Sequence, residues 1–144
     1  MKAAATKRLV LDASVTLAWC FSDESTAYTE AVLDLLANGA EAIAPAIWPF
    51  EVANALLVGE RRKRVTAAQV TSVLQRIGDL PIFVEPIRVD RAFGPILLLA
   101  RNEQLAEYDA AYIELALREG LPLATLDNRL RRAARSAGIT PIRI

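Results

Sequence analysis

The sequence has no histidine among its 144 residues. This excludes the Ser-His-Asp and Cys-His arrangements of nucleophilic enzymes, together with zinc sites that are built on histidine. Any catalysis by this chain therefore has to rest on carboxylates, hydroxyls or a hard metal ion.

Cysteine and long hydrophobic runs are also scarce. The single cysteine, Cys20, rules out a disulfide within the chain, which fits a reducing cytosol. No apolar run approaches the ~18 residues that a membrane span needs, since Asp12, Pro45 and Pro49 interrupt the candidates. The basic start, MKAAATKR, leads into a strand-like run that contains an aspartate, so we predict no signal peptide. We expect a cytoplasmic protein.

The chain has no excess of charge of either sign, because 17 basic residues balance 17 acidic ones. Nucleic-acid-binding proteins usually carry a strong basic excess, so any such binding would have to come from local patches. Two basic runs are candidates, at residues 60–64 and 129–135. For the first run a solvated helix face is the better interpretation.

The size and patterning favour one α/β domain over residues 1–144. A chain of this length with 53% hydrophobic residues can build a core without disulfides or structural metals. Short apolar runs predict strands at 8–11, 41–44, 82–84 and 123–125, with 141–144 as a candidate fifth strand at the edge. Helical periodicity and end signals predict helices at 15–20, 25–37, 48–62, 66–77, 90–102, 108–118 and 128–136. Gly94 and Pro95 predict a kink near the start of the helix over 90–102. This alternation indicates a central parallel sheet of four to five strands flanked by helices.

Four carboxylates occupy unusual positions in this pattern. Asp12 and Asp127 each follow a predicted strand, and Glu51 and Asp109 lie in early helical turns with largely apolar neighbours on the same face. Taken singly, each has an ordinary interpretation as a helix cap, a turn residue or a first-turn acid. Taken together, all four are expected at the edge formed by the carboxyl ends of the strands, where ligands of such sheets bind.

Clustered carboxylates repel one another, and a divalent cation removes that penalty. Ligands that are all oxygen atoms favour Mg²⁺ or Mn²⁺ over zinc. Such an ion polarises a phosphoryl group and lowers the pKa of a bound water. Because histidine is lacking, water activated by a metal ion is the most economical nucleophile.

Four stretches that contain these acids resemble a known family. VLDASV, FEVANAL, YDAAYIELA and LATLDNRL are similar, in order and spacing, to the four acidic motifs of PIN-domain ribonucleases, especially the VapC-type toxins of bacterial toxin–antitoxin pairs. The resemblance implies a PIN-like domain in which Asp12, Glu51, Asp109 and Asp127 bind one or two Mg²⁺ or Mn²⁺ ions. It implies endonucleolytic cleavage of RNA that leaves a 3′-hydroxyl, a VapB-type antitoxin as partner, and a homodimer.

Other residues are candidates for supporting roles. Ser14, Asn54 and Thr125 are candidates to orient the acidic residues, and Arg129, Arg131 and Arg132 are candidates to neutralise RNA phosphates. Local capping, packing or a solvated helix face are the alternatives for these positions. One departure from the family pattern is Ala106, which replaces a serine that often caps the helix before Asp109.

Other functional classes fit less well. DASVT resembles the Asp-x-Asp-x-Thr start of haloacid-dehalogenase-type phosphatases, but Ser14 replaces the second aspartate, and Lys63 is a poor candidate for that family's lysine. A receiver domain would need paired acids and a late lysine, which the sequence lacks. A catalytically silent RNA- or protein-binding module remains an alternative.

Candidate apolar residues for an antitoxin surface, each of which could equally be core, are Trp19, Phe21, Trp48, Leu56 and Leu57.

Overall fold

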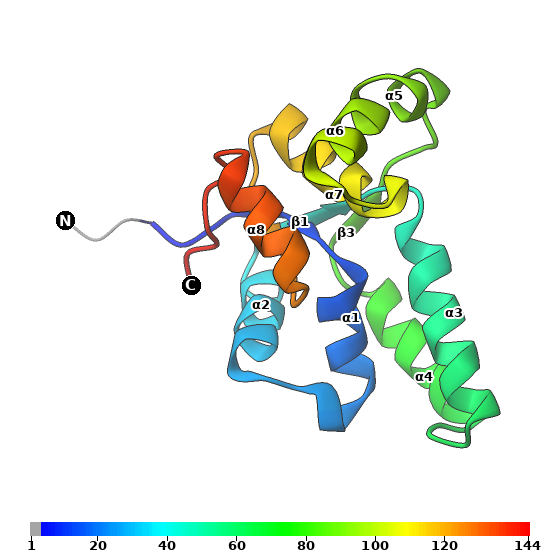
Figure 1. Ribbon diagram of the computed structural model, residues 1–144. Helices are drawn as coiled ribbons and strands as arrows, with labels where there is room; N and C mark the ends of the chain where they lie inside the picture. The colour runs from blue at the N-terminus through cyan, green and yellow to red at the C-terminus, as the bar shows by residue number, and fades with distance from the viewer. Residues whose placement is uncertain (1–3) are drawn as a thin grey trace.

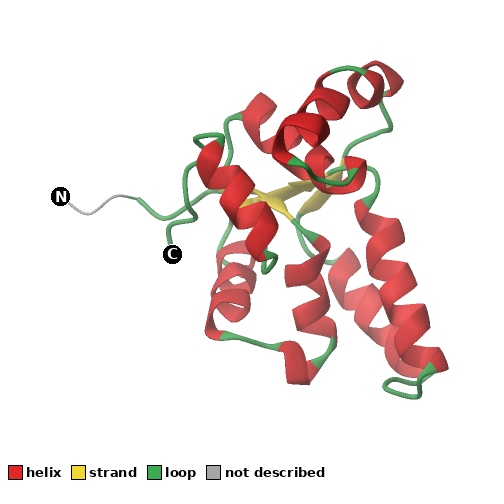
Figure 2. Cartoon of the chain, in the orientation of Figure 1, coloured by secondary structure: helices red, strands yellow, loops and turns green. Residues whose placement is uncertain are grey.

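The computed structural model describes residues 4–144 and has an α/β architecture. Four parallel strands form one sheet in the order β3-β2-β1-β4. The strands are β1 (Arg8–Leu11), β2 (Glu41–Ala44), β3 (Ile82–Val84) and β4 (Leu123–Ala124). Figure 2 shows the sheet at the centre with helices around it, as the sequence pattern predicted.

Helices connect and cover the strands. They are α1 (Ala13–Cys20), α2 (Ala27–Ala37), α3 (Trp48–Arg61), α4 (Ala67–Gly78), α5 (Val89–Phe93), α6 (Pro95–Glu103), α7 (Glu107–Glu119) and α8 (Asn128–Ser136), with a short 3₁₀ turn at Ser22–Glu24. In the view of Figure 1, α1 to α4 lie below the sheet and α5 to α7 lie above it. None of the helices in residues 4–144 has the length and apolar character that crossing a membrane requires.

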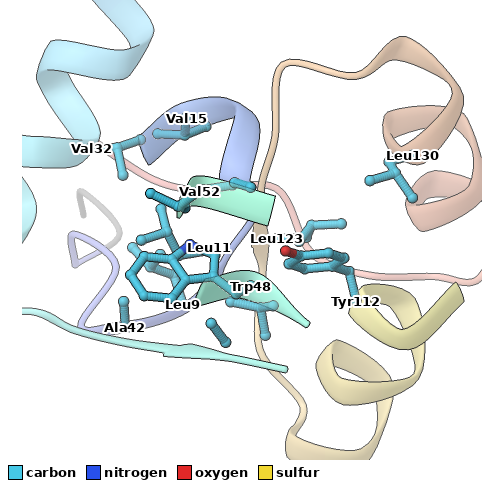
Figure 3. Close-up of a cluster of buried hydrophobic side chains, with 14 of the residues drawn as sticks. Leu9, Leu11, Val15, Val32, Ala42, Trp48, Val52, Tyr112, Leu123 and Leu130 are labelled. Atoms are coloured by element: carbon cyan, nitrogen blue, oxygen red, sulfur yellow. The ribbon is translucent and has the colours of Figure 1, made fainter. Parts of the chain in front are cut away.

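The core is centred on β1. Leu9, Val10 and Leu11 are completely buried, as expected for a central parallel strand that is covered on both faces. Figure 3 shows part of this core, where Trp48 from α3 and Tyr112 from α7 approach the strands from different helices. The buried part of β1 contains no charged residue, and Asp12 follows directly after it.

The order of the strands creates a switch point beside β1. The chain passes from β1 to β2 to β3 in one direction across the sheet, and β4 then pairs on the other side of β1. Ligands of open parallel sheets bind at such points, beyond the carboxyl ends of the strands. Asp12 lies at this point, and its backbone N–H still donates to the carbonyl of Ala124 at the end of β4, across 3.0 Å.

Two predictions about secondary structure need correction. The helix predicted over 90–102 is not merely kinked but interrupted at Gly94, so α5 and α6 are separate helices. Pro95 explains the break, because its ring disfavours helical geometry in the residue that precedes it. The candidate strand at 141–144 does not form either. This segment accepts a backbone hydrogen bond from Thr6 (2.9 Å to the carbonyl of Arg143), which is too little for a ladder.

Candidate functional site

Asp12 lies at the N-terminus of α1, and this residue is only 6% exposed. Its side chain does not cap the helix but accepts hydrogen bonds on Oδ2, from the hydroxyl of Ser14 at 2.6 Å and that of Thr125 at 2.7 Å. Burial raises the pKa of Asp12, the two hydroxyls and the backbone of Ala13 oppose that shift, and the charge of Asp127 adds to it. The site therefore holds a buried carboxylate that its neighbours stabilise only in part.

The hydroxyls of Ser14 and Thr125 also connect the end of β1 to the segment after β4. Ser14 Oγ accepts from the backbone N–H of Leu126 at 3.0 Å, and Thr125 Oγ1 accepts from that of Asp127 at 3.0 Å. Each hydroxyl thus joins the Asp12 carboxylate to the backbone that leads into α8. Both of these candidate supporting residues therefore lie in direct contact with Asp12.

Glu51 lies in the first turn of α3, which begins shortly after β2. Its Oε1 accepts a hydrogen bond from the hydroxyl of Tyr112 at 2.7 Å. Burial raises the pKa of Glu51, the Tyr112 hydroxyl lowers it, and the charges of Asp12 and Asp109 raise it further. This contact was not predicted from the sequence. The available signal was the three-residue spacing that places Tyr112 and Asp109 on the same face of α7, and it does not identify Glu51 as the partner.

Asp109 lies in the first turn of α7, whose N-cap is Ala106. Asp109 is therefore not the helix cap, and Ala106 makes no side-chain capping bond. α7 follows another helix and leads into β4. Burial and the charges of Asp127 and Asp12 raise the pKa of Asp109, and the nearby Arg129 lowers it.

Asp127 is the N-cap of α8, as the capping interpretation predicted. Its Oδ1 accepts from the backbone N–H groups of Arg129 at 2.8 Å and Leu130 at 3.3 Å. Capping does not remove Asp127 from the acidic cluster, because its charge contributes to the raised pKa of both Asp12 and Asp109. Asp127 thus lies near two of the other carboxylates while it caps the helix.

The four carboxylates form a cluster, and none of them makes a salt bridge to a basic side chain within residues 4–144. In the described part of the chain, no three acidic or cysteine side chains are close enough together to form a complete ligand set. The cluster nevertheless fits a divalent cation in charge and in donor chemistry, because its donors are all oxygen atoms and their charges repel.

The remaining candidate residues differ in their surroundings. Asn54 is exposed on α3, and it makes no hydrogen bond to Glu51 within the described residues. Arg129 and Arg132 are exposed on α8. Arg131 is partly buried, where its Nε donates to the carbonyl of Thr125 at 2.9 Å and its guanidinium lies over the ring of Tyr28 at 4.9 Å.

Most of the apolar residues considered for a partner surface belong to the core. Phe21, Trp48 and Leu56 are buried, and Trp19 is partly buried with its indole N–H bonded to the carbonyl of Thr29. Leu57 is the exposed member of that set. The core interpretation therefore holds for most of them.

Fold and site together define an α/β protein with an acidic cluster at the switch point of a parallel sheet. The family model of the PIN domain matches residues 9–136, and this chain belongs to the PIN-domain family. Two curated relatives, the ribonuclease VapC3 proteins of Mycobacterium tuberculosis strains CDC 1551 / Oshkosh and ATCC 25618 / H37Rv, are each 37% identical over 98 residues. That stretch covers 65% of this chain and 66% of each relative, just under two thirds of the relatives' length.

Two solved structures have the same fold. The M. tuberculosis toxin VapC20, described as cleaving the sarcin-ricin loop, matches with a TM-score of 0.65 at 15% identity, covering 94% of this chain and 99% of that one. PAE2754 from Pyrobaculum aerophilum matches with a TM-score of 0.64 at 22% identity, covering 90% and 87%. At these identities the likeness concerns the fold alone. The predicted family and fold are confirmed.

Proposed function

We propose that this chain is a metal-dependent endoribonuclease of the VapC type, active with Mg²⁺ or Mn²⁺. One observation carries the proposal: four carboxylates from separate elements gather at the switch point without a salt-bridge partner in residues 4–144, in a chain of the PIN-domain family. The similarity to two proteins named ribonuclease VapC3 supports RNA as the substrate.

The four acidic side chains would hold the metal ion. Asp12 presents a carboxylate that Ser14 and Thr125 orient, Glu51 is held by Tyr112, and Asp127 caps α8 through Oδ1. When bound, the ion supplies Lewis acidity to a phosphoryl oxygen and lowers the pKa of a water molecule. The protein's own contribution is to hold the oxygen donors ready at a partly buried edge.

Arginines of α8 would bind the RNA backbone. Arg129 and Arg132 are exposed on the helix that Asp127 caps, so their charges start beside the acidic cluster. Each contact with a phosphate would add to a salt-dependent affinity. Arg131 remains part of this proposal, but its contacts with Thr125 and Tyr28 make it chiefly a residue that holds α8 in place.

We also propose a homodimer and a VapB-type antitoxin as partner. A protein interface at α5 and α6 is supported by their exposure: both helices are fully described, and neither contains a buried residue. Val89, Phe93 and Leu98 are exposed there, and neighbouring exposed apolar residues of this kind indicate an interaction surface. A cytoplasmic location and a single domain over residues 1–144 complete the proposal.

The test of this function is cleavage of a pool of RNAs of random sequence. A pool avoids the choice of one substrate, since a selective ribonuclease is inactive on the wrong RNA. With Mn²⁺ the wild-type chain should produce new RNA ends that carry 3′-hydroxyl groups, and chelation with EDTA should abolish them. Asp12→Asn is the matched control, because it keeps the side chain's size and removes its charge.

The alternative is a catalytically silent module that binds RNA or protein. It predicts that the wild type binds RNA equally well with EDTA and cleaves none of the pool. Cleavage by wild type and Asp12→Asn to the same extent would also contradict the proposal, because the activity would then come from a contaminant.

A further inference from the structure

Tyr112 has an unusual position for a residue with a polar group. Its side chain carries a hydroxyl group, and yet the residue is 0% exposed. Figure 3 shows its ring extending away from α7, with the hydroxyl oxygen turned toward the side of the cluster where Trp48 lies. A buried hydroxyl needs a hydrogen-bond partner. Here the partner is Oε1 of Glu51, at 2.7 Å.

This hydroxyl lies where three elements meet. Tyr112 comes from α7 and Glu51 from α3. The backbone of Ala13, at the start of α1, lowers the pKa of Tyr112 and thus also lies near its hydroxyl. Burial, together with the charges of Asp12 and Glu51, raises the pKa of Tyr112, so the phenol stays protonated and remains a donor. The contact therefore joins one carboxylate of the cluster to a rigid ring that the core holds in place.

We infer that Tyr112 is a positioning residue that fixes the Glu51 carboxylate in the orientation required for metal binding. The inference rests on the proposed function. A glutamate side chain has several rotatable bonds, and its ordering costs conformational entropy when an ion binds. A donor fixed on Oε1 restricts that freedom in advance and leaves Oε2 available to an ion. Partners of this kind commonly determine the affinity of a metal site.

Ser14 and Thr125 hold Asp12 in a comparable way. Two of the four carboxylates, one directly after β1 and one on α3, are thus each oriented by a hydroxyl from a distant part of the chain. Glu51 depends on Tyr112 alone among the hydrogen bonds that its side chain makes within residues 4–144. Removal of the Tyr112 hydroxyl oxygen should consequently free the Glu51 side chain to rotate, while the Glu51 carboxylate remains present as a possible metal ligand.

The test is the affinity for Mn²⁺ of Tyr112→Phe, which deletes only the hydroxyl oxygen. Binding is measured by titration of Mn²⁺ against the folded protein, with free Mn²⁺ quantified by its electron paramagnetic resonance signal, and no RNA is present. We expect roughly 10-fold weaker binding than in the wild type. Tyr108→Phe is the matched control, because it deletes the same atom from an exposed residue of the same helix and should bind like the wild type.

A double-mutant cycle separates positioning from a general structural effect. In a Glu51→Gln background, which has no Glu51 carboxylate to orient, Tyr112→Phe should cause no further loss of affinity. Melting of each variant without metal is recorded first, and all titrations are performed well below the lowest melting temperature. If Tyr112→Phe does not fold, Glu51→Asp replaces it: the shorter side chain keeps its charge, withdraws from the hydroxyl, and should show a similar loss.

The outcomes are distinct. If the wild type binds Mn²⁺ and Tyr112→Phe binds it equally well, the positioning role is overturned and the proposed function stands. If Tyr112→Phe weakens binding by the same factor in the wild-type and the Glu51→Gln backgrounds, the effect is structural and the inference is also overturned. If the wild type shows no Mn²⁺ binding at all, the metal-dependent function fails, and the inference fails with it.

Discussion

The hydroxyl of Thr125 donates to Oδ2 of Asp12 across 2.7 Å, although the two residues lie 113 positions apart in the chain. This contact spans the switch point between β1 and β4. It also acts on the chemistry of the cluster, because the hydroxyl lowers the pKa of a carboxyl group whose pKa burial raises. The pH dependence of the site therefore depends on a residue from the far end of the sequence.

Thr125→Val should shift the acid limb of metal binding to higher pH. The substitution keeps the shape of the side chain and removes a donor to the ionised form of Asp12, so the pKa of Asp12 rises further. The direction of the shift follows from the loss of a hydrogen bond that favours the charged form. Mn²⁺ affinity measured as a function of pH tests this, with Thr71→Val on the exposed face of α4 as control. Superimposable pH profiles for Thr125→Val and wild type would contradict it.

Asp12→Asn should stabilise the metal-free protein at neutral pH. Because the pKa of Asp12 is raised in the folded state, the native protein binds more protons than the unfolded chain at pH values from the ordinary value of 3.8 up to the folded one. Stability is thus lost as pH rises through that window. The variant removes this loss, so its Tm at pH 7 should exceed that of the wild type, while below pH 3.8 the difference should shrink. Calorimetry at both pH values checks it, and a lower Tm at pH 7 would refute it.

Glu114→Gln should destabilise the protein through an ion network away from the acidic cluster. The Glu114 side chain is 4% exposed and pairs with Arg91 of α5 and Arg118 of α7, and Arg118 also binds Glu85. Removal of the buried charge deprives Arg91 and Arg118 of their shared carboxylate, which should lower the free energy of unfolding by about 3 kcal/mol. Urea denaturation measures this.

Glu24→Gln is the matched control for that prediction. It breaks an exposed pair with Arg64, so it should cost less than ~1 kcal/mol. Equal losses in the two variants would show that the network around Glu114 has no special weight.

Arg129→Ala should weaken RNA binding without a change in fold. The residue is exposed beside the cluster. The plot of log affinity against log salt has a negative slope, and the loss of one phosphate contact should make this slope less steep by about 0.7–0.9. Binding is measured on an inactive Asp12→Asn background to prevent cleavage. Arg135→Ala, exposed near the far end of α8, is the control. An unchanged slope for Arg129→Ala would remove Arg129 from the RNA surface.

Phe93→Glu should convert the proposed homodimer into a monomer. Phe93 is 78% exposed at the end of α5, and a charge there cannot be buried against a second copy without a large penalty. Light scattering coupled to size-exclusion chromatography gives the mass. Leu74→Glu, at a 41% exposed position on α4, should leave it unchanged. A wild type that is already monomeric at high concentration would contradict the dimer.

Much of the architecture could be predicted from local patterns. The bounds of β2, β3 and α8 match the predicted ranges, since apolar runs and capping residues are local signals. The same patterns placed Asp12 and Asp127 at strand ends and Glu51 and Asp109 in early helical turns, and these are the positions that the four residues have in the fold. At Gly94-Pro95 the pattern predicted a kink within one helix, whereas the structure has a full break between α5 and α6.

The contacts among the site residues depend on the tertiary structure. Strand and helix patterns determine the type and direction of an element, and therefore the edge of the sheet to which its ends belong. They do not determine which side chains touch, because those distances depend on how helices far apart in the sequence pack on the sheet. The bond from Tyr112 to Glu51, the two hydroxyls on Asp12, and the contacts that hold Arg131 against Thr125 and Tyr28 arise only when α3, α7 and α8 are packed around β1.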